Sequence, residues 1–147
     1  MIKLPDAICD SLFHDKFKCG CVFRTLLRCH DGKERPHYFI VLTNSFNIPT
    51  HAFLVATSQT DFYDKNPHFN NDILRIPAKQ LIFFPKNTII DCRKIQIFDK
   101  DILIQRFRDG ILQFMGILPA EIREKLTEIV KKSRFLSLRD RKHILGD

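Results

Sequence analysis

The sequence of 147 residues contains no tryptophan, two tyrosines, two methionines and no long uninterrupted apolar run. Charged or strongly polar residues interrupt every apolar stretch before about 20 residues, so the sequence predicts no membrane-spanning helix. Asp6 and Asp10 come too early for a secretion signal, and we therefore expect a cytoplasmic protein. The 14 phenylalanines take the place of the missing tryptophan and predict a core rich in Phe, Ile and Leu.

The chain also lacks internal repeats and any linker that would divide it. Its length suits one domain with a single core. A composition of 44% hydrophobic and 28% charged residues is ordinary for a globular protein and argues against general disorder. We predict an N-terminal helix or arm over residues 1–18, one domain over 19–138 and an exposed tail over 139–147.

The five cysteines form no recognisable metal-binding pattern. Zinc is an alternative for Cys19, Cys21, Cys29 and His30, but a Cys-x-Cys pair lacks the two-residue gap of structural zinc sites. Alternation along a strand already explains why Cys19 and Cys21 point the same way. We expect reduced thiols that act as small packing residues, with no metal and no cofactor.

Hydrophobic patterning predicts antiparallel strands first and helices after them, a β-rich α+β fold. Strand-length segments rich in β-forming residues occupy 20–28, 36–43, 51–57, 73–77 and 88–98. Asp31-Gly32 marks a reversal between the first two strands. The polar segment 58–71 is expected to form a long exposed loop, and loops of that length are often functional.

Helical spacing appears at both ends of the chain. Asp99 is expected to cap a helix over 100–108 that ends at Gly110. A second helix is expected to begin near Pro119. Its apolar face comprises Ile122, Leu126, Ile129, Val130 and Ser133. The apolar residues near helical spacing in the N-terminal segment are Leu4, Ile8, Leu12 and Phe13.

The formal net charge is +7 and the isoelectric point is near 9.3. A basic surface attracts polyanions, so nucleic acid is the first class of partner to consider. An acidic protein partner fits the same charge, and mild basicity for solubility alone is a third interpretation.

Five segments occur in an order and spacing that resemble a known family. Gly20-Cys21-Val22 stands at that family's Gly-Asp-Ile/Val opening, and Arg35-Pro36 stands at its Arg-Pro pair before a very apolar strand. Thr57 matches the hydroxyl residue that ends its third strand. The segments LRIPAKQL (74–81) and NTIIDCRKIQIFDKDIL (87–103) match its next strand and the approach to a helix. Over about residues 18–138, the chain resembles the MazF/PemK family of RNA-cleaving toxins.

The chain departs from the family pattern at three places. Cys21 replaces the usual acid, and the loop before Arg35 is short. Where the family commonly has Gln-x-Arg, this chain has Lys94-Ile95-Gln96, so the family's arginine is missing at Gln96. Lys94 is expected to supply part of that charge.

The resemblance implies a small SH3-like antiparallel barrel with appended C-terminal helices. It implies a homodimeric, metal-independent endoribonuclease that cleaves single-stranded RNA and is neutralised by an acidic antitoxin. In such a reaction the ribose 2′-hydroxyl is the nucleophile, so the protein has only to hold the phosphate, neutralise its charge and manage two protons.

The resemblance and the chemistry together nominate the site residues. Arg35 and Thr57 are the expected catalytic pair, because a guanidinium fork matches phosphate oxygens and a hydroxyl can hydrogen-bond them. Alternatively, Arg35 is a solvated loop residue and Thr57 serves strand propensity. His37 is either a general base or a surface histidine. The expected substrate-binding residues are Ser58, Lys33, Lys94, His37 and Tyr63.

Two other functional classes remain open on the sequence. A gyrase poison like the CcdB toxins would share the fold and need no Arg35 or Thr57 chemistry. A non-catalytic nucleic-acid-binding module would fit the missing family arginine at Gln96.

Overall fold

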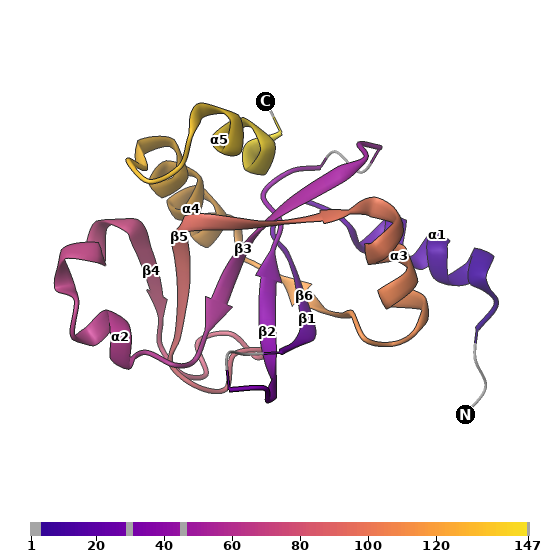
Figure 1. The fold of residues 1–147 in the computed structure, drawn as a ribbon, viewed down its shortest axis with the longest axis horizontal. Coiled ribbons are helices and arrows are strands. Elements are labelled where there is room, and N and C mark those ends of the chain that lie inside the picture. The colour runs from indigo at the N-terminus through magenta and orange to yellow at the C-terminus, as the bar shows by residue number, and fades with distance from the viewer. Residues whose placement is uncertain (1–3, 29–30, 45–46, 147) are drawn as a thin grey trace.

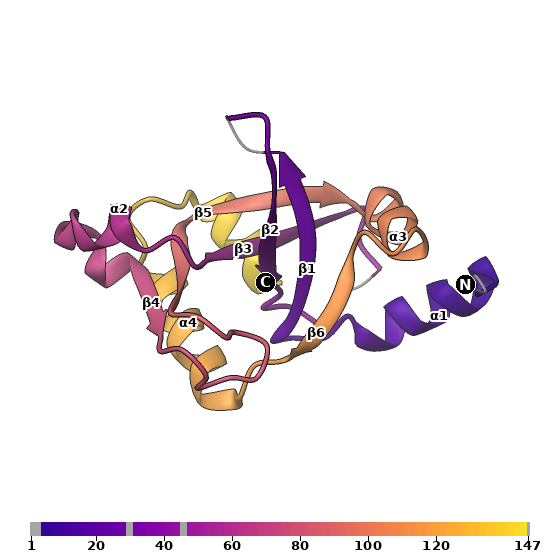
Figure 2. The same ribbon diagram turned by 90° about the horizontal axis from the view of Figure 1, so that it is seen from below.

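A computed structural model describes residues 4–28, 31–44 and 47–146 of the chain. Within these residues, antiparallel strands form one six-stranded sheet in the order β4-β5-β3-β2-β1-β6. The sheet curls into a half-barrel with helices packed around it (Figures 1 and 2). The fold is therefore α+β, as the patterning of strands before helices predicted.

The strands are β1 (Cys21–Arg28), β2 (Glu34–Ile40), β3 (Thr50–Thr57), β4 (Ile73–Ile76), β5 (Thr88–Asp99) and β6 (Gln113–Ile117). The helices are α1 (Asp6–Lys16), α2 (Asp61–Asp64), the 3₁₀ helix η1 (Pro67–Asp72), α3 (Lys100–Arg108), α4 (Ala120–Lys132) and α5 (Leu138–Leu145). Five strands and the helices α1, α3 and α4 lie where the sequence predicted them. Asp99 is the residue before α3, but no hydrogen bond from its side chain caps that helix among the described residues.

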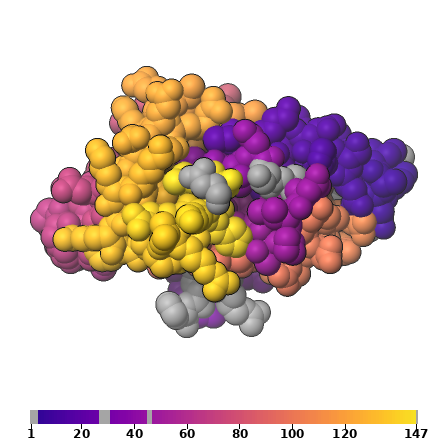
Figure 3. Space-filling view, turned by 90° about the horizontal axis from the view of Figure 1, so that it is seen from above, coloured from indigo at the N-terminus to yellow at the C-terminus, as the bar shows by residue number. Residues whose placement is uncertain are grey.

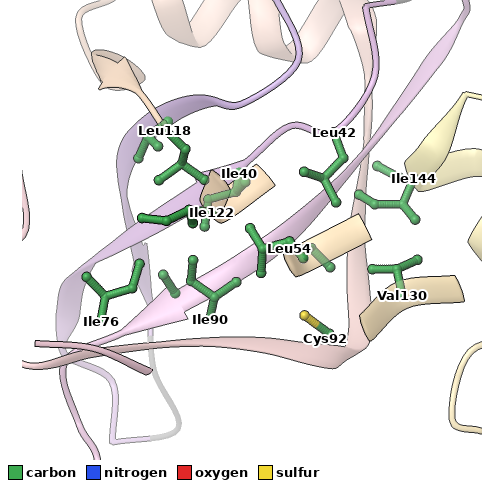
Figure 4. Packing of buried hydrophobic residues seen from close by; sticks show 14 of the residues in the cluster. Ile40, Leu42, Leu54, Ile76, Ile90, Cys92, Leu118, Ile122, Val130 and Ile144 are labelled. Carbon is green, nitrogen blue, oxygen red and sulfur yellow. The ribbon is translucent and has the colours of Figure 1, made fainter. Parts of the chain in front are cut away.

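Alternation along the strands separates two apolar clusters, one on each face of the sheet. On one face, Ile122 of α4 and Ile144 of α5 pack against Ile40, Leu54 and Ile90 (Figure 4). Figure 3 shows α4 and α5, in orange and yellow, covering much of the molecule when it is seen from above.

The opposite face is built mainly from phenylalanines and is covered by α1 and α3. Its fully or nearly fully buried aromatic residues are Phe13, Phe17, Phe23, Phe39 and Phe53. Together the two clusters confirm the predicted core of Phe, Ile and Leu.

Helix α1 forms as expected but buries a different face. Cys9 and Phe13 are buried, whereas Leu4, Ile8 and Leu12 remain 48%, 48% and 39% exposed. The reason is that the helix docks on the phenylalanine cluster through Phe13, which makes ring contacts with several of its members.

The segment 58–71 is not the uniformly exposed loop that its polarity predicted. It forms α2 and most of η1, and Tyr63 is buried against Ile73 and Ile89. This single aromatic residue anchors the segment to the sheet, and a count of polar residues does not reveal such an anchor.

The sequence did not predict two further elements. Strand β6 pairs with β1 at the edge of the sheet, although no strand was predicted between the last two helices. Residues predicted as an exposed tail form α5, with Ile144 fully buried. The Ser137 hydroxyl accepts a hydrogen bond from the backbone N–H of Asp140, and Gly146 ends the helix in the left-handed region, so both caps favour a helix here.

No helix in the described part of the chain is long and apolar enough to cross a membrane. Cys9, Cys19, Cys21 and Cys92 carry free thiols. Burial raises the pKa of Cys21 to about 12 and that of Cys92 as well, so both thiols stay neutral in the core. Cys29 and His30, the other members of the zinc alternative, lie outside the described residues.

Candidate functional site

A cavity of about 290 Å³ opens where β2 begins and β3 ends. Three segments distant in the sequence line it: the start of β2, the residues that follow β3, and the approach to β5. The lining residues are Arg35, Pro36, His37, Tyr38, Thr57, Ser58, Gln59, Phe84, Pro85, Lys86 and Thr88. Four residues nominated from the sequence, Arg35, His37, Thr57 and Ser58, are among them.

Strand register explains this convergence. Tyr38 of β2 pairs with Ala56 of β3 in an antiparallel ladder. Continuing the register by one position sets His37 opposite Thr57, and directly opposed residues point to the same face. Arg35 lies two positions from His37 in β2 and therefore shares that face.

The Arg35 guanidinium pairs with the carboxylate of Asp31, four residues earlier. Both side chains are about 40% exposed. Exposed ion pairs contribute little free energy, so an anion of higher charge can displace Asp31 from the guanidinium. Arg35 is thus held at the rim of the cavity and remains open to a ligand.

His37 is half-buried beside this cation. Burial, followed by the charge of Arg35, lowers the pKa of His37 below its ordinary value of 6.5. The imidazole is therefore neutral at physiological pH, the protonation state that a general base requires.

The hydroxyl of Thr57 fixes the turn that leaves β3. Its oxygen accepts a 3.1 Å hydrogen bond from the backbone N–H of Gln59. This contact uses the hydroxyl as an acceptor and leaves its proton to donate to a ligand oxygen. Ser58, exposed between them, adds a second hydroxyl at the cavity.

Three nominated residues do not line the cavity. Lys33 is exposed in the turn between β1 and β2, and Lys94 is exposed in β5 where the pairing with β3 changes register. Tyr63 is only 8% exposed, and its hydroxyl donates to Asp91. Burial raises the pKa of Tyr63 to about 12, with the Asp91 carboxylate adding to the shift. Tyr63 is thus a buried donor and not the substrate-binding residue in an exposed loop that was expected.

The segment between β4 and β5 supplies the part of the site that sequence reasoning missed. Phe84 meets Tyr38 edge to face with ring centroids 5.1 Å apart, and Pro85 extends this apolar wall. Lys86 is exposed and gives the cavity a second cation. The turn signal around Pro85 indicated a loop, but no periodicity indicates that a loop folds back onto β2.

The cavity combines one polar and one apolar wall. The cations Arg35 and Lys86 can bind the oxygens of a phosphate, and the hydroxyls of Thr57 and Ser58 can donate hydrogen bonds to them. The neutral imidazole of His37 can accept a proton. The aromatic and proline wall suits a flat heterocycle. A single nucleotide offers all of these groups together.

Comparison with known proteins adds no identification: no protein-family model matches the chain, and no curated protein matches it. What the cavity binds must therefore be inferred from its own side chains.

Proposed function

We propose that the chain is a metal-independent endoribonuclease that cleaves single-stranded RNA, as its resemblance to the MazF/PemK toxins implies. The observation that carries the proposal is that Arg35, His37 and Thr57 line one cavity although they come from two strands. The proposal includes the finer features of that family: an SH3-like barrel, a homodimer and an acidic antitoxin as partner. The net charge of +7 is favourable for both RNA and such an antitoxin.

In the proposed reaction the ribose 2′-oxygen attacks the adjacent phosphorus while the bond from phosphorus to the 5′-oxygen breaks. The products are a 2′,3′-cyclic phosphate and a 5′-hydroxyl. His37, neutral because its pKa is lowered, accepts the proton from the 2′-hydroxyl. Arg35 and Thr57 donate hydrogen bonds to the phosphate oxygens as negative charge develops on them.

The proton that the 5′-oxygen needs comes from a group on the opposite side of the phosphorus. The resemblance assigns this step to Arg35. Lys86 is a second cation at the cavity and assists by neutralising charge on the phosphate. Tyr38 and the exposed Pro85 offer an apolar surface to the base beside the scissile bond, and the buried ring of Phe84 supports Tyr38 from behind.

The test is to incubate the purified protein with mixed-sequence RNA in excess EDTA and to analyse the product ends. We expect cyclic phosphate ends, and a loss of at least about 100-fold in rate for Arg35→Ala. Arg139→Ala is the matched control, because Arg139 is exposed on α5 and does not line the cavity.

The rival classes give different results in this experiment and in a separate gyrase supercoiling assay. RNA that stays intact while binding is retained contradicts the enzyme and favours a nucleic-acid-binding module. Inhibition of gyrase supercoiling together with intact RNA favours a CcdB-like poison. Equal cleavage by wild type and Arg35→Ala would point to a contaminating nuclease and contradict the proposal.

A further inference from the structure

The register of the sheet extends the row that contains Thr57 across two more strands. Thr57 of β3 pairs with Ile89 of β5, and Ile89 pairs with Arg75 of β4. Directly opposed residues point to the same face, so Arg75 emerges on the same face as Thr57. Strands lie about 4.8 Å apart, which sets the two backbone positions about 10 Å from each other.

A second cavity, of about 250 Å³, lies at this end of the row. Its polar lining includes Thr60, Asp64, Arg75 and Asn87, and Ile76 and Pro77 contribute an apolar wall. Thr88 lines both this cavity and the one that contains Arg35 and Thr57. The two linings therefore share one residue, which is only 3% exposed.

The polar groups of the second cavity are available to a ligand. Arg75 forms a 2.8 Å ion pair with Asp64, but the two side chains are 45% and 53% exposed, so the pair is weak. The Asn87 side-chain oxygen accepts a 2.7 Å hydrogen bond from the backbone N–H of Ala78. That bond orients the amide group and leaves its NH₂ as a donor for the edge of a base.

We infer that Arg75 binds the phosphate next to the scissile one. The cavity beside Arg75 then holds a nucleoside attached to that phosphate. This inference rests on the proposed function, because it assigns Arg75 to the same RNA strand that Arg35 and Thr57 engage. Arg75 acts on substrate binding and register along the strand, since a guanidinium fork holds a phosphate with defined geometry. The protein then prefers substrates longer than a dinucleotide.

Substrate length is the direct test. A dinucleotide has only the scissile phosphate, whereas a trinucleotide extended at one end or the other adds a flanking phosphate. We expect one of the two extensions to raise kcat/KM of the wild type about tenfold, and Arg75→Gln to remove most of this gain. Asp64→Asn, which frees Arg75 from its ion pair, should preserve or increase the gain. Arg139→Gln is the control and should behave as wild type.

Binding of uncleavable 2′-deoxy oligonucleotides tests Arg75 independently of cleavage. For the extended oligonucleotide, Arg75→Gln should lower the slope of log affinity against log salt by about 0.7, the value for one phosphate contact on a single strand. An equal loss for short and long substrates, or no loss for either, overturns the inference. If the wild type binds these oligonucleotides but cleaves no RNA, the proposed function fails while Arg75 is still judged by the salt slope. Absence of any binding overturns both.

Discussion

Tyr63 donates a 2.8 Å hydrogen bond to the carboxylate of Asp91, and this contact holds α2 against the first part of β5. The same carboxylate accepts hydrogen bonds from the side chain and the backbone N–H of Arg93. The Arg93 guanidinium lies 4.0 Å from the ring centroid of Phe69, so the next turn of the segment is held as well. Because α2 follows Ser58 by only a few residues, the network also fixes one wall of the candidate site.

Tyr63→Phe should destabilise the protein by about 1–2 kcal/mol, because it removes a hydrogen-bond donor from a buried carboxylate. Urea denaturation at neutral pH measures this change. Tyr38→Phe is the matched control, since no hydrogen bond joins the Tyr38 hydroxyl to a described residue, and it should change the free energy of unfolding by less than about 0.5 kcal/mol. Equal effects of the two substitutions would contradict the role given to Tyr63.

The Asp91 network also predicts an acid-dependent loss of stability. Burial alone would raise the pKa of Asp91, but hydrogen bonds from Arg93 and Tyr63 outweigh it and hold the pKa below its ordinary value of 3.8. The folded state therefore favours the carboxylate, and this stabilisation is present above pH 3.8 and lost as the pH falls through the lowered pKa.

Asp91→Asn should consequently be much less stable than wild type at pH 7, and the difference between them should shrink as the pH falls below about 4. Thermal unfolding of both proteins over this range provides the measurement. A difference that is constant with pH would mean that the Asp91 charge does not contribute to stability.

Most of the sheet could be predicted because its signals are local. The apolar run and β-branched residues of β3 and the amphipathic pattern of α4 act within one element. Strand β6 has five residues and is defined by its pairing with β1, so its main determinant lies almost a hundred positions away. Tyr63 shows the same limit, because its burial depends on Ile73, Ile89 and Asp91 meeting it in space.

The same contrast between local signals and distant contacts applies to the candidate site. Arg35 and Thr57 were found from the sequence because a resemblance supplied their spacing, and the register of β2 and β3 accounts for their proximity. Lys86 and Phe84 reach the cavity through the fold of a long connection, which no local pattern encodes. Charge alone did not separate Lys94, which does not line the cavity, from Lys86, which does.

Helix α5 gives a direct test of the segment that composition had assigned to an exposed tail. Ile144 is fully buried in the cluster beneath α4, so Ile144→Ala should destabilise the protein by about 2–4 kcal/mol. Leu138→Ala is the matched control at the start of the same helix, where the side chain is 61% exposed, and should cost less than about 0.5 kcal/mol. Denaturation midpoints that are equal for both variants would mean that α5 does not contribute to the fold.

The last prediction concerns His37 and the pH dependence of cleavage. Burial and the charge of Arg35 lower its pKa, so the imidazole should be neutral and able to accept a proton across the physiological range. We expect kcat/KM to rise with pH through a midpoint below 6.5 and then to level off. The NMR titration of the His37 ring protons should give the same midpoint.

His37→Gln should lower kcat/KM by about 100-fold or more and remove this acidic limb, because glutamine cannot take up the proton. His68→Gln provides the control, since His68 is exposed on η1 and does not line the cavity. The two measurements must agree for His37 to be the base. A rate limb that persists in His37→Gln would assign the proton to another group, whereas an NMR midpoint above 6.5 would show that Arg35 does not act on the imidazole as the geometry requires.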